Sequence, residues 1–122
     1  MFEVMVESLF SAANKLDHYT FEGRCDELHG HNFVVQVFAA APTLNAANVS
    51  VDRHQLKLAL EVLVHRLDHT SLTTFPDFEG NPTSVENTTR YFFRHLKTQF
   101  PQVSRVVIQE TPSQSACYFE AS

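Results

Sequence analysis

Four leucines with helical spacing constrain the fold of this chain more than any other feature. They follow the pattern i, i+4, i+7, i+11, which is one face of a helix, and they are Leu56, Leu60, Leu63 and Leu67. Asp52 precedes them, and its carboxylate can accept the free amide protons of a first helical turn. The pattern therefore predicts a helix of about four turns that buries one face.

A second amphipathic helix is expected after a long polar connection. Its start is predicted at Thr83-Ser-Val-Glu86, a capping box in which hydroxyl and carboxylate side chains bind the first free amides. The helix should end near Gln99, before Pro101, because proline cannot continue a helix. Its expected buried stripe is Val85, Thr89, Phe92 and Leu96, with Phe93 beside it.

Strand patterns flank the two helices on both sides. Apolar and polar residues alternate from Phe2 onward, and an apolar run covers residues 31–41. Two further strands are expected at residues 105–111 and 116–121, joined by a polar turn. The predicted fold class is α+β, with a four-stranded antiparallel sheet and both helices packed on one face, in the order ββααββ. Because open sheet edges favour aggregation, neighbouring subunits are expected to cover them.

Length and charge limit the possible partners of the chain. Its 122 residues are expected to form a single domain, 1–122, with a core drawn from the 43% of apolar residues. The net charge is −5 and no basic run is present, which argues against nucleic acid as a partner. No apolar stretch is long enough for a membrane span, and the N-terminus lacks a signal-peptide pattern. With only two cysteines, the chain is expected to be a soluble protein of the reducing cytoplasm.

The stretch Cys25-Asp-Glu-Leu-His-Gly-His31 carries the strongest sign of chemistry. Successive side chains of a strand alternate between faces, so His29 and His31 share a face and can bind one tetrahedral Zn²⁺. Cys25, in the preceding polar loop, is suited to be either a third ligand or a nearby base. The alternative is a loop thiol and two half-buried imidazoles that bind no metal.

Two further positions have side chains suited to acid–base chemistry and to ligand binding. Asp68 and His69 lie at the end of the first predicted helix, where a carboxylate can orient an imidazole for proton transfer. Glu110, at the end of a predicted strand, has a carboxylate that can accept two hydrogen bonds from a guanidine-like heterocycle. The alternatives are a commonplace Asp-His pair and a solvated strand-end carboxylate. From the residues alone, the chemistry indicated is zinc-assisted proton abstraction on a small polar metabolite.

Taken in order, these motifs resemble the 6-pyruvoyltetrahydropterin synthase / 6-carboxytetrahydropterin synthase family. The resemblance covers nearly the whole chain, and its motifs are Phe10-Ser-Ala-Ala, Cys25-x-x-x-His29-Gly-His31, Val51-Asp52, Leu67-Asp68-His69, Asn81-Pro-Thr with Glu86-Asn87, and Glu110-Thr111. It implies a T-fold, in which the sheets of three subunits join into a barrel and two such trimers stack as a homohexamer. It also implies a zinc ion and a pterin site between subunits.

The resemblance also implies a reaction and roles for individual residues. Those roles are zinc ligation by His29 and His31, a catalytic thiolate at Cys25, proton transfer by Asp68 with His69, and pterin binding by Glu110 with Thr83 or Ser84. The implied reaction converts 7,8-dihydroneopterin triphosphate to 6-carboxytetrahydropterin, on the route to queuosine and related 7-deazapurines. The alternative within the family is a 6-pyruvoyltetrahydropterin synthase. The Asp-His pair could serve the thiolate of a neighbouring subunit.

One position departs from the family pattern. The family supplies a third zinc histidine in the sequence F-S-A-A-H-R-L, and this chain has Asn14 at that place. Because an amide oxygen is a poor zinc ligand, three arrangements stay open. In the first, His18 joins His29 and His31 as the third ligand. In the second, Asn14 or Cys25 weakly completes the two histidines. In the third, the site binds zinc poorly, and the chain is a non-catalytic pterin-binding homologue or one with altered activity.

Overall fold

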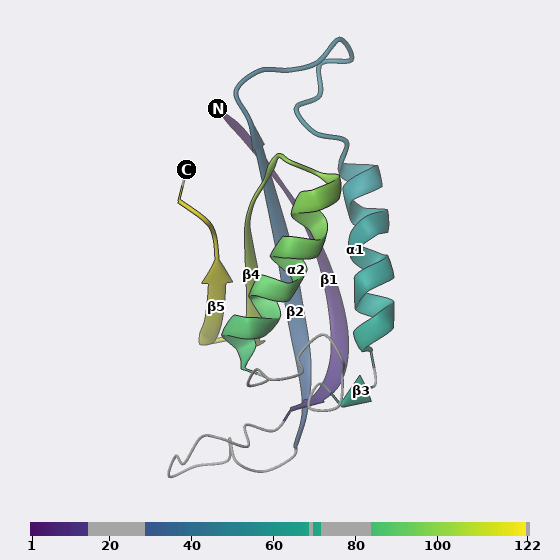
Figure 1. The fold of residues 1–122 in the computed structure, drawn as a ribbon, viewed down its shortest axis with the longest axis vertical. Coiled ribbons are helices and arrows are strands. Elements are labelled where there is room, and N and C mark those ends of the chain that lie inside the picture. The colour runs from purple at the N-terminus through teal and green to yellow at the C-terminus, as the bar shows by residue number, and fades with distance from the viewer. Residues whose placement is uncertain (15–28, 69, 72–83, 122) are drawn as a thin grey trace.

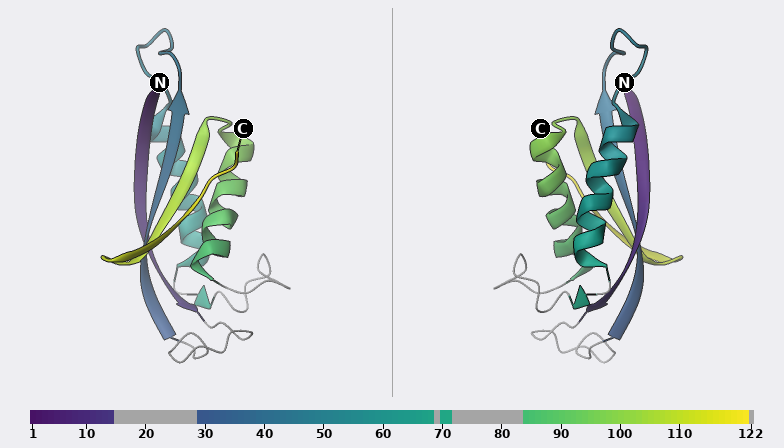
Figure 2. Two further views of the ribbon diagram at one scale, coloured as in Figure 1. Left: turned by 90° about the vertical axis from the view of Figure 1, so that its left-hand side faces the viewer. Right: turned by 90° about the vertical axis from the view of Figure 1, so that its right-hand side faces the viewer.

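The computed structural model describes residues 1–14, 29–68, 70–71 and 84–121, which form one sheet and two helices. The elements in chain order are β1 (Phe2–Asn14), β2 (His29–Ala41), α1 (Arg53–Leu67), β3 (Thr70–Ser71), α2 (Val85–Gln99), β4 (Val103–Thr111) and β5 (Gln114–Tyr118). The strands lie in the order β3-β1-β2-β4-β5. Figure 1 shows both helices in front of the sheet, and the side views in Figure 2 show them on the same face.

β1 and β2 form the longest pairing of the sheet. They are antiparallel over all 13 residues of each strand, from Phe2 opposite Ala41 to Asn14 opposite His29. β4 pairs with the other edge of β2, and β5 pairs with β4, both antiparallel. The residues that these strands bury alternate along the chain, and they include Val6, Phe10, Phe33, Val35, Val37, Val106 and Ile108. The predicted four-stranded antiparallel sheet is confirmed.

The two helices cover the apolar face of this sheet. α1 packs over β1, and α2 packs over β4 and β5. The predicted stripe of α1 is buried, and its members are Leu56, Leu60, Leu63 and Leu67. In α2, Phe92 and Phe93 are buried, and the ring centroid of Phe92 lies 5.6 Å from that of Phe10 in β1. Neither helix of the described chain is long and apolar enough to cross a membrane.

The two helix starts test the predicted caps. The Asp52 carboxylate accepts the amide of Gln55 at 3.1 Å and caps α1, as predicted. The predicted start of α2 at Thr83 was wrong by one residue. The cap is Ser84, whose hydroxyl accepts the amide of Asn87 at 3.1 Å. Glu86 consequently lies in the first turn of α2, where it does not complete the predicted capping box.

β3 is an addition to the predicted elements. It is a two-residue strand that runs parallel to β1, with Thr70 opposite Ala12 and Ser71 opposite Ala13. It lies inside the long connection that the sequence suggested between the two helices. A strand of two residues is too short to show a period of two, so hydrophobic patterning could not reveal it.

Polar contacts also attach α1 to the outer edge of β1. Lys57 donates a hydrogen bond to the main-chain carbonyl of Glu7 and pairs with Glu61 at 3.0 Å. The Ser8 hydroxyl, and after it Lys57, lower the pKa of the Glu61 carboxyl. Exposed ion pairs of this kind contribute about 1 kcal/mol or less. Burial of the leucine stripe is therefore the main interaction that holds α1 on the sheet.

Candidate functional site

Five elements begin or end at one end of the sheet, which is the lower end in Figure 1. β1 and α1 end there, and β2 and α2 begin there. β4 also ends there, because it runs antiparallel to β2. We call this region the site end, and it comprises residues 11–14, 29–31, 68, 70–71, 84–86 and 109–111. Every predicted site residue that falls in the described part of the chain belongs to it.

The predicted metal ligands lie on the paired ends of β1 and β2. His29 is the cross-strand partner of Asn14, and His31 is the cross-strand partner of Ala12. Directly opposed residues of an antiparallel pair have Cβ atoms about 4.5–5.5 Å apart. The register therefore sets Asn14, the position that departs from the family pattern, directly opposite the first histidine. The side chains of these four residues lie outside what the structure describes.

The metal site itself stays a prediction. Among the side chains that the structure describes, no three of His, Cys, Asp and Glu are grouped to hold a metal ion. Of the predicted site residues, Cys25, His18, His69 and Thr83 lie outside the described residues. The donors at the paired strand ends are two imidazoles and one amide. Catalytic zinc usually has three protein ligands drawn from His, Cys and carboxylates, so this set is one good ligand short.

Asp68 has the best-defined surroundings of the predicted catalytic residues. Its main-chain amide donates to the carbonyl of Val64 at 2.9 Å and ends α1. Its carboxylate oxygen Oδ1 accepts the main-chain amide of Ser11, in β1, at 2.7 Å. β3 follows at once and pairs with the next two residues of β1. The chain is thus attached to β1 immediately before and immediately after position 69.

Glu110 lies near the end of β4, beside the first turn of α2. Gln109 is opposite Val34 in the β2–β4 register, so Glu110 is one residue nearer to the site end. The half-buried Glu110 lines an open hollow of about 420 Å³. The hollow is lined by Val85, Glu86, Glu110, Gln114, Ser115, Ala116 and Cys117. The two carboxylates that line the hollow, Glu86 and Glu110, can accept hydrogen bonds from a heterocycle that carries N–H groups along one edge.

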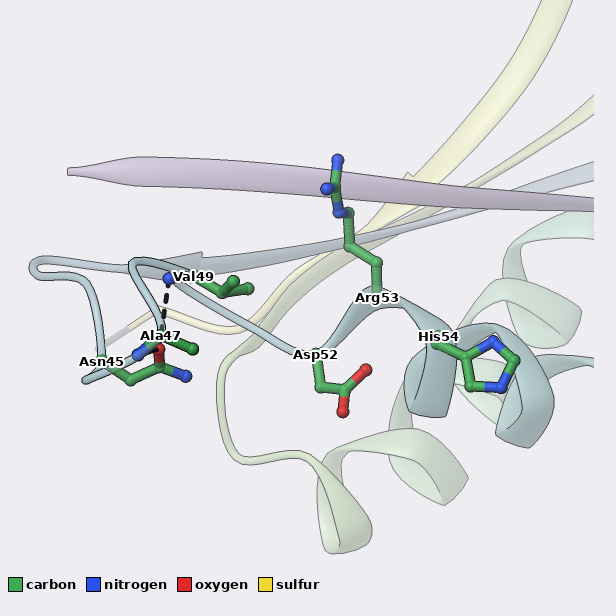
Figure 3. A pocket seen from close by; sticks show the side chains of 6 residues that line it. All are labelled: Asn45, Ala47, Val49, Asp52, Arg53 and His54. Carbon is green, nitrogen blue, oxygen red and sulfur yellow. Dashed lines mark hydrogen bonds between the residues drawn. The ribbon is translucent and has the colours of Figure 1, made fainter.

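A second hollow, of about 430 Å³, lies at the opposite end of the sheet, where β2 connects to α1. It is lined by Asn45, Ala47, Val49, Asp52, Arg53 and His54 (Figure 3). The Asn45 side chain accepts the amides of Ala47 and Val49, at 2.8 and 3.1 Å, and so closes the loop on itself. Figure 3 shows the side chains of Arg53 and His54 pointing in different directions. The polar groups of this hollow therefore stabilise the loop and the helix start, and none of the predicted site residues lies there.

Sequence reasoning missed two parts of the site end. The first is the amide of Ser11, because a main-chain group has no letter of its own and its partner is 57 residues away. The alternation of β1 could have shown which edge this amide faces, but not that Asp68 lies there. The second is the contribution of β5 to the hollow at Glu110. The sequence suggested that Gln114 and Ser115 are turn residues, but they pair with the end of β4 and line the hollow together with the first turn of α2.

The chain is similar to known proteins over nearly its whole length. The family described as 6-pyruvoyl tetrahydropterin synthase matches residues 3–121. A 6-carboxy-5,6,7,8-tetrahydropterin synthase of Synechocystis is 32% identical, over 98% of this chain and 94% of its own. A 6-pyruvoyl tetrahydrobiopterin synthase of Drosophila melanogaster is 29% identical, over 79% of this chain and 61% of its own. The solved structure of Caenorhabditis elegans 6-pyruvoyl tetrahydropterin synthase has a TM-score of 0.83 and 26% identity, over 99% of this chain and 98% of that one.

Proposed function

This chain belongs to the 6-pyruvoyl tetrahydropterin synthase family, and we propose that it acts as a 6-carboxytetrahydropterin synthase in the cytoplasm. The proposed reaction converts 7,8-dihydroneopterin triphosphate to 6-carboxytetrahydropterin, which would enter the route to queuosine and related 7-deazapurines. The strongest support is the 32% identity with the Synechocystis protein of that name, which extends over 98% of this chain. The second candidate is a 6-pyruvoyltetrahydropterin synthase, which the names of the Drosophila and Caenorhabditis relatives favour.

The proposed mechanism gives proton transfer to the chain's own residues. Cys25, as a thiolate, takes a proton from a carbon of the substrate side chain. Asp68 orients His69, and a carboxylate in that role also stabilises the protonated imidazole when it carries the proton onward. Triphosphate then leaves, and addition of one water cleaves the side chain between carbons, which releases its two-carbon end as acetaldehyde and leaves the carboxyl group on the ring. The contact that supports this assignment is the hydrogen bond from Ser11, which holds the Asp68 carboxylate at the site end.

The hollow at Glu110 is the proposed site of the pterin ring. A pterin presents an amino group and a ring N–H along one edge, and a carboxylate can accept both hydrogen bonds at once. Glu110, in β4 beside the start of α2, is half-buried, so such bonds would be partly shielded from water. Thr83, which precedes the cap of α2, is proposed to assist in holding the ring.

Product analysis tests the proposed reaction. Purified protein supplied with 7,8-dihydroneopterin triphosphate should release one acetaldehyde for each triphosphate, because cleavage of the side chain distinguishes the 6-carboxy reaction. Both products can be quantified by chromatography in the same sample. Triphosphate release without acetaldehyde would support the 6-pyruvoyl reaction instead. Pterin binding without release of triphosphate would indicate a non-catalytic homologue.

Substitution of Glu110 tests the proposed pterin site. Glu110→Gln removes one charge-assisted acceptor, so the KM for the substrate should rise about 10- to 100-fold, which corresponds to the roughly 1.5–3 kcal/mol of a hydrogen bond to a charged group. Steady-state kinetics at several substrate concentrations would measure this. Glu120→Gln is the matched control, because Glu120 is an exposed carboxylate beyond β5 that accepts the Tyr118 hydroxyl at 2.8 Å. Equal KM values in the two variants would contradict the assignment.

We further propose that His29 and His31 bind a zinc ion, with Asn14 as the weak member of the ligand set. When bound, zinc would act as a Lewis acid on the hydroxyl groups of the substrate side chain. Asn14 is opposite His29 in the register, which supports its proximity to the metal. His18 is the alternative third ligand.

Restoring the histidine tests the role of Asn14. Asn14→His should raise the zinc affinity by about tenfold or more, because an imidazole is a much better zinc ligand than an amide. Zinc per chain, measured by mass spectrometry after dialysis against buffered zinc, gives the affinity of each variant. The control is Asn48→His, at the opposite end of the sheet, where φ is 61° and histidine is tolerated. An unchanged affinity in Asn14→His would show that this position is not the damaged ligand.

A homohexamer with sites between subunits is the proposed assembly. Within the described residues, β3 covers the outer edge of β1 only at Ala12 and Ala13, and β5 lies at the other edge of the sheet. Such edges are templates for pairing with another chain. Leu9 in β1 and Phe119 after β5 are also 64% and 66% exposed, which a subunit interface would reduce.

Mass measurement tests this assembly. Light scattering on purified protein at micromolar concentration should give six times the chain mass of 13.9 kDa. Three times the chain mass would support the barrel but not the stacking of two trimers. A mass of one chain would contradict the proposed assembly altogether.

A further inference from the structure

The main-chain amide of Ser11 faces away from β2. Ser11 is opposite Asn32 in the β1–β2 register, yet its amide donates to Asp68. In an antiparallel pair, the main-chain groups of successive residues point alternately toward the partner strand and away from it. Glu7 lies four residues earlier and has the same orientation in β1. Its main-chain carbonyl also points away from β2 and accepts a hydrogen bond from Lys57. The β1–β2 ladder therefore does not depend on the Ser11 amide.

The hydrogen bond from Ser11 to Asp68 joins two otherwise separate elements. The donor is an amide of a 13-residue strand, and buried residues of β1 and β2 fix the register between these two strands. The acceptor is the side chain of the residue that ends α1. At 2.7 Å this is a short bond from an amide to a carboxylate, the kind that is stronger than a bond between neutral groups. It therefore fixes the carboxylate relative to the sheet, and not only relative to its own helix.

We propose that the Ser11 main-chain amide is a positioning group for the proton-transfer pair, and this inference rests on the proposed function of Asp68 and His69. A carboxylate oxygen can accept more than one hydrogen bond, so the bond from Ser11 leaves capacity for an imidazole N–H. Position 69 follows directly, and β3 ties the chain to β1 again at Thr70. Ser11 thus acts through Asp68 and does not itself take part in proton transfer.

Ser11→Pro tests the positioning role of the Ser11 amide without removing a hydrogen bond of the β1–β2 pairing. Proline has no amide hydrogen, and it is accepted in strands at positions whose amide faces away from the partner strand. It also requires an extended conformation at the preceding residue, which Phe10 already has as part of β1. Ser11→Ala is the matched control, because it removes the Ser11 hydroxyl, which donates to the Asn32 side chain, and keeps the main-chain amide. Both variants lose the bond to Asn32, but only Ser11→Pro removes the bond to Asp68.

The kinetic comparison of these variants tests the proposal. Ser11→Pro should lower kcat by about 10- to 100-fold, because a small displacement of a proton-transfer group slows the chemical step. KM should change less than about twofold, since the ring is assigned to the hollow at Glu110. Ser11→Ala, which keeps the amide, should keep kcat within about twofold of the wild type. Equal losses of kcat in the two variants, or a Ser11→Pro loss carried by KM, would overturn the proposal.

Hydrogen exchange tests the same contact without activity. In the wild type, NMR should find the Ser11 amide protected, and Asp68→Ala should make it exchange about tenfold faster or more. The Leu9 amide should exchange equally in both proteins. Unchanged protection of Ser11 in Asp68→Ala would overturn the proposal, even if Ser11→Pro does not fold. An inactive wild type with the expected exchange would refute the proposed function and the positioning role that depends on it, while the contact itself would stand.

Discussion

The antiparallel pairing of β1 with β2 is the constraint on which the rest of the structure depends. A slip of one residue in this register would move every buried side chain of one strand to the open face. Val6 and Phe10 in β1, and Val35 and Val37 in β2, are buried, so such a slip would expose the core. The same register decides that Asn14 meets His29 at the far end of the ladder. The core therefore sets the geometry of the site end from a distance.

The last residues of β1 use both edges of the strand. One edge pairs with β2 and so with the predicted metal-binding positions. The other edge holds Asp68 through the amide of Ser11, and then β3 through Ala12 and Ala13. Two groups of predicted site residues that are far apart in the sequence are thereby attached to one short segment. An edge that would otherwise invite another chain is occupied at this end by the chain's own residues.

Local patterning predicted the parts of the fold that bury an apolar face. The leucine stripe of α1 and the long strands repeat over several turns or several pairs, so their periods are visible in the sequence. The Asp52 cap is visible because it is a good capping residue directly before such a stripe. The cap of α2 was misplaced because Thr83 and Ser84 are both good caps, and only the observed bond to Asn87 distinguishes them. The bond from Ser11 to Asp68 had no sequence signal, because it depends on how α1 docks on β1. Cys25, His69 and Thr83 were identified from sequence motifs alone, and their roles stay predictions.

Asn14 differs from the histidine of the family pattern in its side chain, and the described scaffold around it does not depend on that side chain. A cross-strand pair is joined through main-chain groups, which asparagine and histidine have in common, so either residue can lie opposite His29 in the same register. The attachments of Asp68 and β3 to β1 involve positions 11–13 and do not use the side chain of position 14. The predicted ligand set and the predicted acid–base pair therefore depend on different contacts of β1. The predicted role of Asp68 in proton transfer therefore does not depend on which residue stands at position 14.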